Sequence, residues 1–289
     1  MTVEPGTKML DTIEEKVAAG ERLSFEDGVL LLQSTDLLRV GAMADLARRR
    51  LVGDDVYFIN NRHINHTNVC GNRCKFCAFS ADEGAEDAYT LTLEEVLDRA
   101  RASLADEITE LHIVGGEHPS LPYDYYLNLI RSLRGLDPDV HLQAFTASEI
   151  AFFAKRTKRT EEEVLLEMKE AGLGSMPGGG AEIFAERVRG IVCDKKISGE
   201  KWLEVMRTAH GVGIKSNATM LYGHIETLEE RIDHLVRLRE LQDETGGFGS
   251  VIPLAYNPAN TEFDELPGTQ AMTDLSMLRV TILRPQHTR

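Results

Sequence analysis

The feature that most constrains the fold of this chain is a regular alternation of short apolar segments with longer amphipathic ones. The short segments are rich in Val, Ile and Leu, as strands buried on both faces usually are. The longer segments place their apolar residues at helical spacing. Neighbouring parallel strands need a crossover connection, which a helix supplies. The alternation therefore predicts an α/β fold whose parallel sheet forms a (β/α) barrel or part of one.

Six strands are expected, at residues 56–69, 110–114, 141–146, 174–176, 215–222 and 250–256. The expected helices span 9–19, 27–51, 93–104, 123–133, 161–171, 199–210 and 228–243. No Pro-rich linker or change of composition divides the chain, so we expect a single domain over 1–289. In that domain, 1–55 is a helical extension and 56–257 is the barrel core.

The chain beyond the sixth expected strand is too short for two further units of about 30 residues each. We therefore expect the last two strands of an eight-stranded barrel to be missing, and 258–289 to be a truncated or atypical C-terminal segment. An unclosed parallel barrel would expose strand edges.

The charge balance excludes some classes of partner. The chain has 32 Lys and Arg against 47 Asp and Glu, a formal net charge of −15. Such an acidic protein is poorly suited to binding the phosphate backbone of nucleic acids. No stretch approaches the roughly 20 apolar residues that cross a bilayer. We expect a cytoplasmic protein with no nucleic-acid or membrane partner.

Three of the four cysteines, Cys70, Cys74 and Cys77, lie in one short window with the spacing C-x3-C-x2-C. Disulfides within so tight a loop would be strained and would leave one thiol over, so metal ligation is the better interpretation. Three thiolates can hold three irons of a cubane cluster and leave the fourth iron open. The alternative is a zinc site completed by His63 or His66. Cys193 is expected to be a small apolar core residue.

The cysteine window carries a resemblance when it is combined with other segments. With Phe76 before the last cysteine and Gly115-Gly116-Glu117 after the second strand, the chain resembles the radical S-adenosylmethionine (SAM) superfamily. Within it, residues 61–65, 112–119, 175–183 and 218–227 resemble the aminofutalosine synthases of menaquinone biosynthesis. The resemblance spans about 56–267, whereas residues 193–196 depart from the Pro-Asp-Lys usual there.

The resemblance implies a TIM-type barrel, a [4Fe-4S] cluster on Cys70, Cys74 and Cys77, and SAM bound at the open iron. Gly115 and Gly116 would let the backbone approach the methionine end of SAM, and Glu117 would accept its ammonium protons. The other expected SAM contacts are Phe76, Ser148, Glu149, Glu182 and Arg187. The expected substrate contacts are Arg62, His118, Asn217, Thr219 and His224. No residue is singled out for catalysis.

The implied reaction adds the 5′-deoxyadenosyl radical to the enol-ether double bond of 3-[(1-carboxyvinyl)oxy]benzoate, giving aminofutalosine and consuming SAM as a co-substrate. The implied electron donor is a reduced flavodoxin or ferredoxin. Two alternatives remain open. One is a sister activity, either the dehypoxanthine futalosine cyclase or the deazaflavin cofactor synthase. The other is a non-catalytic zinc-binding module.

Overall fold

The computed structural model describes residues 5–262 and 273–282. Within them, six strands form one parallel sheet in the order β1-β2-β3-β4-β5-β6. The strands are β1 (Asn61–Ile64), β2 (Glu110–Ile113), β3 (His141–Ala144), β4 (Ser175–Met176), β5 (Lys215–Tyr222) and β6 (Phe248–Ala255). The strand order follows the chain order, as in a barrel that is wound in one direction and left open. The expected α/β fold with six parallel strands in a half-barrel is confirmed.

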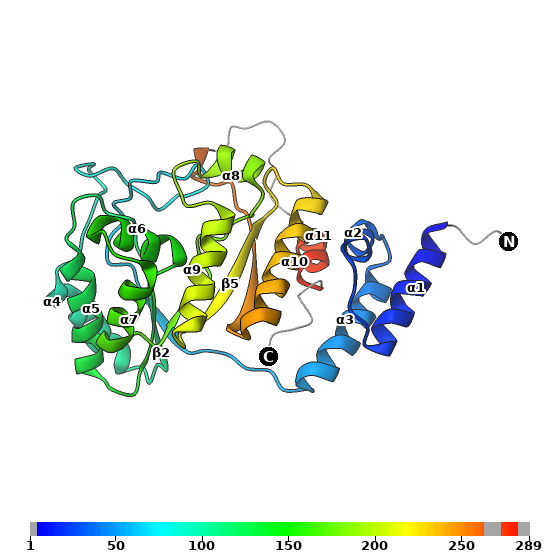
Figure 1. Cartoon of the computed structure of the whole chain (residues 1–289), viewed down its shortest axis with the longest axis horizontal. Helices are drawn as coiled ribbons and strands as arrows, with labels where there is room; N and C mark the ends of the chain where they lie inside the picture. Colours follow the sequence, from blue (N-terminus) through cyan, green and yellow to red (C-terminus); the bar gives the residue numbers. More distant parts are fainter. Residues whose placement is uncertain (1–4, 263–272, 283–289) are drawn as a thin grey trace.

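Helices connect the strands and cover the outer face of the sheet (Figure 1). They are α4 (Leu93–Leu104), α5 (Tyr123–Leu136), α6 (Ala147–Thr157), α7 (Glu161–Ala171), α8 (Glu186–Val192), α9 (Gly199–Gly211) and α10 (Leu228–Thr245). A further helix, α11 (Asp274–Ile282), follows β6. The remainder of the expected C-terminal segment, 263–272 and 283–289, lies outside the described residues.

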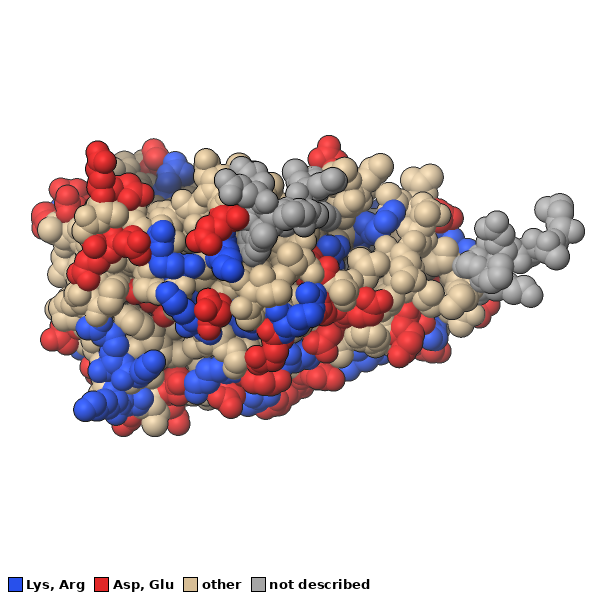
Figure 2. All heavy atoms as spheres, turned by 90° about the horizontal axis from the view of Figure 1, so that it is seen from above, with Lys and Arg blue, Asp and Glu red and all other residues tan. Residues whose placement is uncertain are grey.

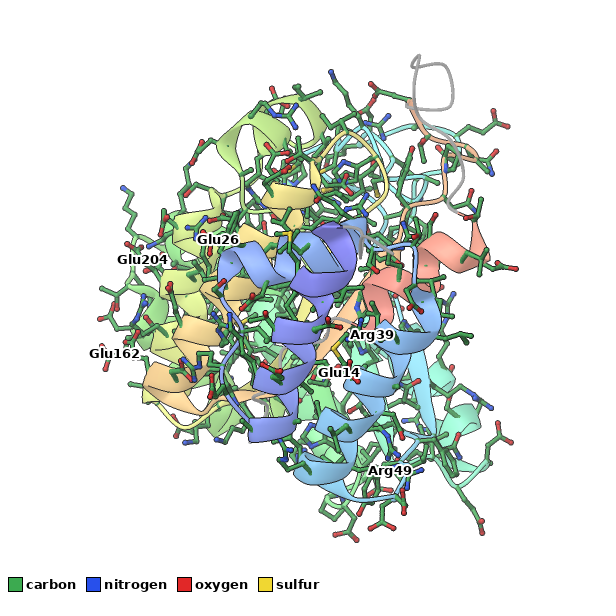
Figure 3. The ribbon with its side chains drawn as sticks, turned by 90° about the vertical axis from the view of Figure 1, so that its right-hand side faces the viewer. Glu14, Glu26, Arg39, Arg49, Glu162 and Glu204 are labelled. Carbon is green, nitrogen blue, oxygen red and sulfur yellow. The ribbon has the colours of Figure 1, made fainter. Side chains whose placement is uncertain are left out.

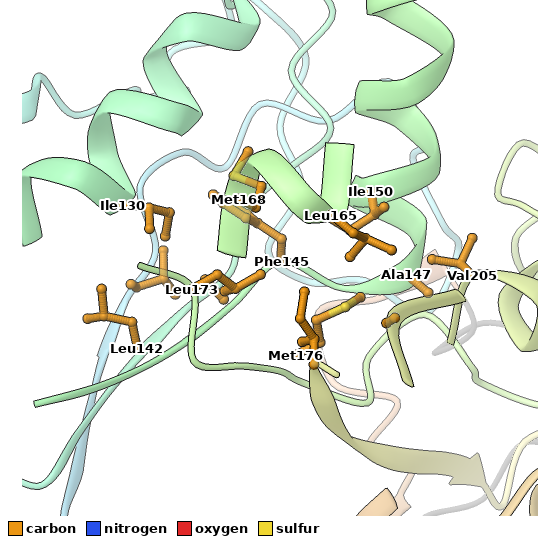
Figure 4. Close-up of a cluster of buried hydrophobic side chains, with 14 of the residues drawn as sticks. Ile130, Leu142, Phe145, Ala147, Ile150, Leu165, Met168, Leu173, Met176 and Val205 are labelled. Carbon is orange, nitrogen blue, oxygen red and sulfur yellow. The ribbon is translucent and has the colours of Figure 1, made fainter. Parts of the chain in front are cut away.

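The main core lies between the sheet and these helices. Leu142 of β3 and Met176 of β4 are fully buried against Ile130, Leu165 and Met168 from α5 and α7 (Figure 4). Burial of a side chain of this size contributes about 1.5–3 kcal/mol. This packing fixes which face of each strand meets the helices, and therefore which face is left for the concave side of the sheet.

Three helices precede the sheet: α1 (Pro5–Ala19), α2 (Phe25–Gln33) and α3 (Leu37–Val52). They lie together at one end of the molecule (Figure 1). They bury a small apolar core of their own, which includes Ile13, Leu31 and Met43. An ion pair between Glu14 of α1 and Arg39 of α3 joins two of them at the surface (Figure 3).

The expected single helix over 27–51 was wrong, because the structure divides it into α2 and α3. Ser34 is extended at the end of α2, with φ −60° and ψ 138°. The side chain of Asp36 then accepts a hydrogen bond from the backbone N–H of Arg39 and begins α3. Apolar periodicity continues across this break, which is why it does not reveal the break.

The expected first strand over 56–69 was too long, since only Asn61–Ile64 pairs with β2. Val56, Tyr57 and Phe58 precede the strand and have exposed fractions of 83–90%. The expectation also omitted α6, α8 and α11. Of these, α6 begins with a capping box in which Thr146 and Glu149 each bond the other's backbone N–H, a signal that the sequence does carry.

Acidic and basic side chains are interspersed over the face displayed in Figure 2. In the described part of the chain, no helix is long and apolar enough to cross a membrane.

Candidate active site

The loop that carries Cys70, Cys74 and Cys77 begins shortly after β1 and is held by backbone hydrogen bonds. The N–H of Cys70 donates to the carbonyl of Ala81 at 3.1 Å, which closes the loop on itself. The N–H of Gly71 donates to the carbonyl of Glu117 at 3.1 Å, which fastens the loop to the segment after β2. The N–H of Lys75 donates to the carbonyl of Val192 at 3.0 Å. These bonds give an irregular loop a defined position beside two other segments.

The three cysteines line a cavity of about 120 Å³ at the carboxyl ends of the strands. Phe76 lies on the same wall. The other walls come from the segments after β2, β3 and β4 and from the loop after α8; they include Gly115, Gly116, Glu117, Ser148, Glu149, Gly180 and Lys196. The structure thus brings together the cysteines and six of the expected SAM contacts. The carboxyl end of a parallel barrel is where sites of this fold class are formed.

The two glycines after β2 permit a close approach of backbone to the cysteine loop. A Cβ atom at Gly116 would lie 2.1 Å from the carbonyl oxygen of Val69 and 2.9 Å from Cβ of Cys70. A Cβ atom at Gly115 would lie 2.5 Å from the ring of His66. No side chain fits at either distance, so this wall of the cavity requires glycine at both positions.

Two of the three thiols, those of Cys70 and Cys74, have raised pKa values. Burial raises the pKa of Cys70. A hydrogen bond with Cys193 and burial together raise the pKa of Cys74. Cys193 itself is buried in an apolar cluster that also contains Cys74. Metal binding removes the proton from such a thiol, because the metal stabilises the thiolate.

The donor set fits a cubane cluster better than a single metal ion. Among the described residues, no group of three or more His, Cys, Asp and Glu side chains is arranged to hold one ion. In a cubane each thiolate binds a different iron, so the three sulfurs need not converge on one point. The two histidines considered for zinc lie elsewhere: His63 stacks on His112 within the sheet, and His66 is fully buried beneath Gly115.

Two carboxyl groups, those of Glu117 and Glu149, line the same cavity as the cysteines. Glu117 accepts a hydrogen bond from the hydroxyl of Ser148, and burial raises its pKa. Glu149 accepts from the backbone N–H of Thr146 at 2.7 Å and of Gly115 at 3.3 Å. Burial raises the pKa of Glu149 to about 7, although these hydrogen bonds oppose the shift. Glu149 therefore fixes the walls of the cavity, while Glu117 can accept from a bound cation.

Lys196 is a cavity residue that the sequence did not single out. Its ammonium lies 2.8 Å from a carboxylate oxygen of Glu182 and 5.6 Å from the ring centroid of Phe76. Burial disfavours both charges, but their mutual attraction raises the pKa of Lys196 and lowers the pKa of Glu182. The site thus holds one buried cation, in the segment where the sequence departs from the family pattern.

Two of the expected SAM contacts do not line the cavity. Glu182 lies behind the wall, paired with Lys196. Arg187 has a side chain that is 51% exposed and forms an ion pair with Glu230 at 2.6 Å. It also donates to the carbonyl of Ile225.

The five expected substrate contacts also lie outside the cavity walls. Arg62 is exposed and pairs with Asp106 at 3.1 Å. The other four already have hydrogen-bond partners within the fold. Nδ1 of His118 accepts from the N–H groups of Ser120 and Leu121, and Nδ1 of His224 accepts from the N–H of Ile225. The Thr219 hydroxyl donates to the carbonyl of Gly178, and the Asn217 side-chain oxygen accepts from the Ser250 hydroxyl.

Comparison with known proteins agrees with this geometry. The family model of the radical SAM superfamily matches residues 64–238. The chain is 49% identical over 268 residues to an aminodeoxyfutalosine synthase from Thermus thermophilus, covering 92% of this chain and 72% of that protein. It is 41% identical over 282 residues to 5-amino-6-(D-ribitylamino)uracil–L-tyrosine 4-hydroxyphenyl transferase from Methanopyrus kandleri, covering 95% of this chain and 76% of that protein.

The fold has solved counterparts. A crystal structure of methylornithine synthase superposes with a TM-score of 0.73 and 18% sequence identity, covering 94% of this chain and 77% of that one. At this identity the likeness concerns the fold alone. Together with the family match over the cysteine loop and most of the sheet, it shows that the chain belongs to the radical SAM superfamily.

Proposed function

We propose that this protein is a radical SAM transferase of the aminofutalosine synthase type, which joins the 5′-deoxyadenosyl group of SAM to the enol ether 3-[(1-carboxyvinyl)oxy]benzoate. One observation carries the proposal: the three cysteines and the Gly115–Glu117 segment line one cavity. The identity of 49% to an aminodeoxyfutalosine synthase supports the choice of reaction.

Cys70, Cys74 and Cys77 would hold a [4Fe-4S] cluster in this cavity. When bound, the cluster supplies the electron that cleaves SAM, and that electron comes from an external reduced donor. The chain's own residues bind and orient the co-substrate. The Glu117 carboxyl group accepts hydrogen bonds from the SAM ammonium, and the backbone of Gly115 and Gly116 leaves room for the methionine end.

Lys196 is well placed to bind the carboxylate of SAM. It is a cation on the cavity wall, beside Phe76, whose ring would lie against the adenine. Arg187 was the expected carboxylate partner, but its guanidinium lies at the surface and does not line the cavity. Both cations have an acidic partner, Glu230 for Arg187 and Glu182 for Lys196, so their position decides between them. A buried ammonium attracts a carboxylate more strongly than an exposed guanidinium, because less water screens it.

The remaining task is to hold C5′ of SAM against the double bond and to exclude water. Positioning of two reactants can lower a barrier by about 7–11 kcal/mol. Three walls of the cavity follow strand ends, and Glu149 joins two of them by accepting from the N–H groups of Thr146 and Gly115. We therefore assign the catalytic effect to positioning rather than to proton transfer.

A second candidate function is favoured by the 41% identity to the 4-hydroxyphenyl transferase. That relative is named for 5-amino-6-(D-ribitylamino)uracil and L-tyrosine. A chain of its kind would form no adenosyl adduct with the enol ether.

An anaerobic assay with dithionite and SAM separates the two candidates. One reaction contains the enol ether, and the other contains the aminouracil with L-tyrosine. The proposal expects an adenosylated adduct by mass spectrometry in the first reaction only. The Cys74→Ser protein is the matched control and should form none. Cleavage of SAM to 5′-deoxyadenosine with no adduct, together with turnover of the aminouracil, would replace the proposal with the second candidate.

A further inference from the structure

A row of polar side chains crosses four neighbouring strands on the concave face of the sheet. His63 of β1 pairs in register with His112 of β2, His112 with Gln143 of β3, and Gln143 with Ser175 of β4. These four residues, the inner row, thus occupy one level of the half-barrel. Their strand neighbours Leu111 and Leu142 are fully buried in the core formed with the helices. Because side chains alternate along a strand, the inner row points to the opposite face.

Hydrogen bonds hold the inner row in one arrangement. The Gln143 amide nitrogen donates to the Ser175 hydroxyl oxygen at 3.2 Å, and His141 bonds the same oxygen at 2.7 Å. The side chain of Gln143 also lies beside the His112 ring, with which it is in register, and it opposes the lowering of the His112 pKa. The plane of the His112 ring is therefore set by its neighbours.

His63 and His112 form a flat surface of two imidazole rings. Their ring centroids lie 4.4 Å apart and their planes differ by 17°, so the two rings stack. Burial, together with the neighbouring His63, lowers the pKa of His112 to about 4, so this imidazole is neutral at physiological pH. His63 is the exposed member of the pair. A planar ring on the concave side can therefore reach the stack at His63.

The inner row lies directly below the cavity. Val114 follows His112 by two positions and lines the cavity. Two residues of an extended strand span about 7 Å, which is close to the length of a substituted benzene ring. A ligand seated on the row thus reaches the level at which C5′ of SAM would be held.

The charge on the concave face gives a direction to such a ligand. Glu110 precedes His112 by two positions on β2 and accepts a hydrogen bond from the Asn61 side chain at 3.1 Å. At this level Glu110 repels a carboxylate, and the ammonium of Lys215, which is in register with Ser175, bonds the Gly246 carbonyl at 2.8 Å. Lys196 of the cavity wall attracts the carboxylate. The carboxylates of an anionic aryl substrate are therefore directed toward the cavity.

We propose that the stacked imidazoles of His63 and His112 are the platform on which the aromatic ring of the substrate lies, and that they position its enol ether beneath the SAM cavity. This assignment rests on the proposed function, because that function supplies an aryl substrate. The stacked imidazoles select the flat ring of the substrate, whereas Lys196 of the cavity wall selects its carboxylate. His63 and His112 are positioning residues under this assignment.

The test compares His63→Ala, His63→Phe and the wild-type protein, all reconstituted with cluster and SAM. Isothermal titration calorimetry measures the Kd for 3-[(1-carboxyvinyl)oxy]benzoate, and a parallel assay measures the ratio of adenosyl adduct to free 5′-deoxyadenosine. We expect His63→Ala to raise the Kd about three- to tenfold, as loss of an aromatic stacking partner does. The adduct fraction should fall with it, while the KM for SAM should stay unchanged. His63→Phe keeps a flat ring and should restore the wild-type Kd.

Lys169→Ala is the matched control, since Lys169 lies on α7, outside the sheet, and its ammonium bonds the Val212 carbonyl. It should bind the enol ether as the wild type does. The platform assignment is overturned if His63→Ala binds the enol ether normally, or if His63→Phe is as impaired as His63→Ala. If the wild type forms adduct and His63→Ala binds the enol ether as tightly as the wild type, the platform alone is refuted. A wild-type protein that forms no adduct refutes the proposed function and the platform together.

Discussion

The ammonium nitrogen of Lys196 lies 2.8 Å from a carboxylate oxygen of Glu182, and the two side chains are only 16% and 9% exposed. The backbone of Glu182 is also held in place. It has a positive φ of 46°, and its carbonyl accepts a hydrogen bond from the N–H of Leu221. The pair joins the loop after α8 to the segment after β4. It therefore holds a charged side chain at the cavity while keeping that charge compensated.

Removal of one member of the Lys196–Glu182 pair should lower the free energy of unfolding more than removal of both members. Lys196→Gln leaves the buried Glu182 carboxylate without its ion-pair partner, and we expect the free energy of unfolding to fall by about 3–5 kcal/mol. The double variant Lys196→Met with Glu182→Leu should lose much less, since neither charge of the pair is left buried alone. Urea denaturation of the cluster-free proteins measures both values.

Arg187→Gln supplies the comparison for this pair, because it breaks the ion pair with Glu230, in which Arg187 is 51% exposed. We expect a change of at most about 1 kcal/mol there. Equal losses for Lys196→Gln and Arg187→Gln would show that the Lys196–Glu182 pair is not held away from solvent.

Glu149 should make the stability of the protein depend on pH in a definite direction. Its pKa is raised from 4.5 to about 7 by burial, so the folded state holds the proton more tightly than the unfolded state. The stabilisation is complete below about pH 4.5 and is lost as the pH rises through 7. Glu149→Gln should remove a slope of up to about 1.4 kcal/mol per pH unit within that window. Chemical denaturation at several pH values gives the difference between variant and wild type.

A second capping box provides the control for Glu149. Glu163 caps α7 through Thr160 as Glu149 caps α6 through Thr146, but Glu163 is exposed and its backbone and side-chain hydrogen bonds with Thr160 lower its pKa. Its contribution is present above its usual pKa and is lost as the pH falls. Glu163→Gln should therefore leave the slope between pH 5 and 7 intact. If both variants keep that slope, Glu149 is not the group responsible.

The sequence predicted the parts of the fold and of the site that depend on residues close to one another along the chain. Cys70, Cys74 and Cys77 lie within eight positions of one another, so their spacing alone indicates a shared loop. The Gly115–Glu117 segment lies at the end of a strand, and strand ends of a parallel barrel meet. The spacing of apolar residues also located β2 to β6, because this spacing differs between buried strands and helices.

The parts that the sequence did not reveal depend on register and on loop conformation. Lys196 reaches the cavity only because the loop after α8 packs against the cysteine loop, through the bond from Lys75 to Val192. His63 and His112 become neighbours only because β1 and β2 pair in one register. A shift of β1 by one residue against β2 would turn His63 toward the helices and separate the two rings. Arg62, one position from His63, points to the other face for that reason.

Gly116 should be intolerant of any side chain. A Cβ atom there would lie 2.1 Å from the carbonyl oxygen of Val69, and neither backbone can move without disturbing the hydrogen bond between Gly71 and Glu117. We expect Gly116→Ala to lower the free energy of unfolding by about 1–3 kcal/mol and to reduce iron incorporation. Gly135→Ala is the control, because a Cβ atom at this helical glycine meets nothing within 4 Å. That variant should be neutral or more stable by up to about 1 kcal/mol.

The four cysteines should separate into three that hold the cluster and one that does not. Cys70→Ser, Cys74→Ser and Cys77→Ser each remove a thiolate from the cavity wall, and we expect each protein to lose most of its iron after anaerobic reconstitution. Cys193→Ala removes the partner of Cys74 but no cavity residue, and it should bind iron and sulfide as the wild type does. Iron analysis and electron paramagnetic resonance of the reduced proteins give the comparison. A different result would indicate a structural zinc site made by all four thiols. In that case the wild type would bind stoichiometric zinc and no iron, and Cys193→Ala would lose the zinc.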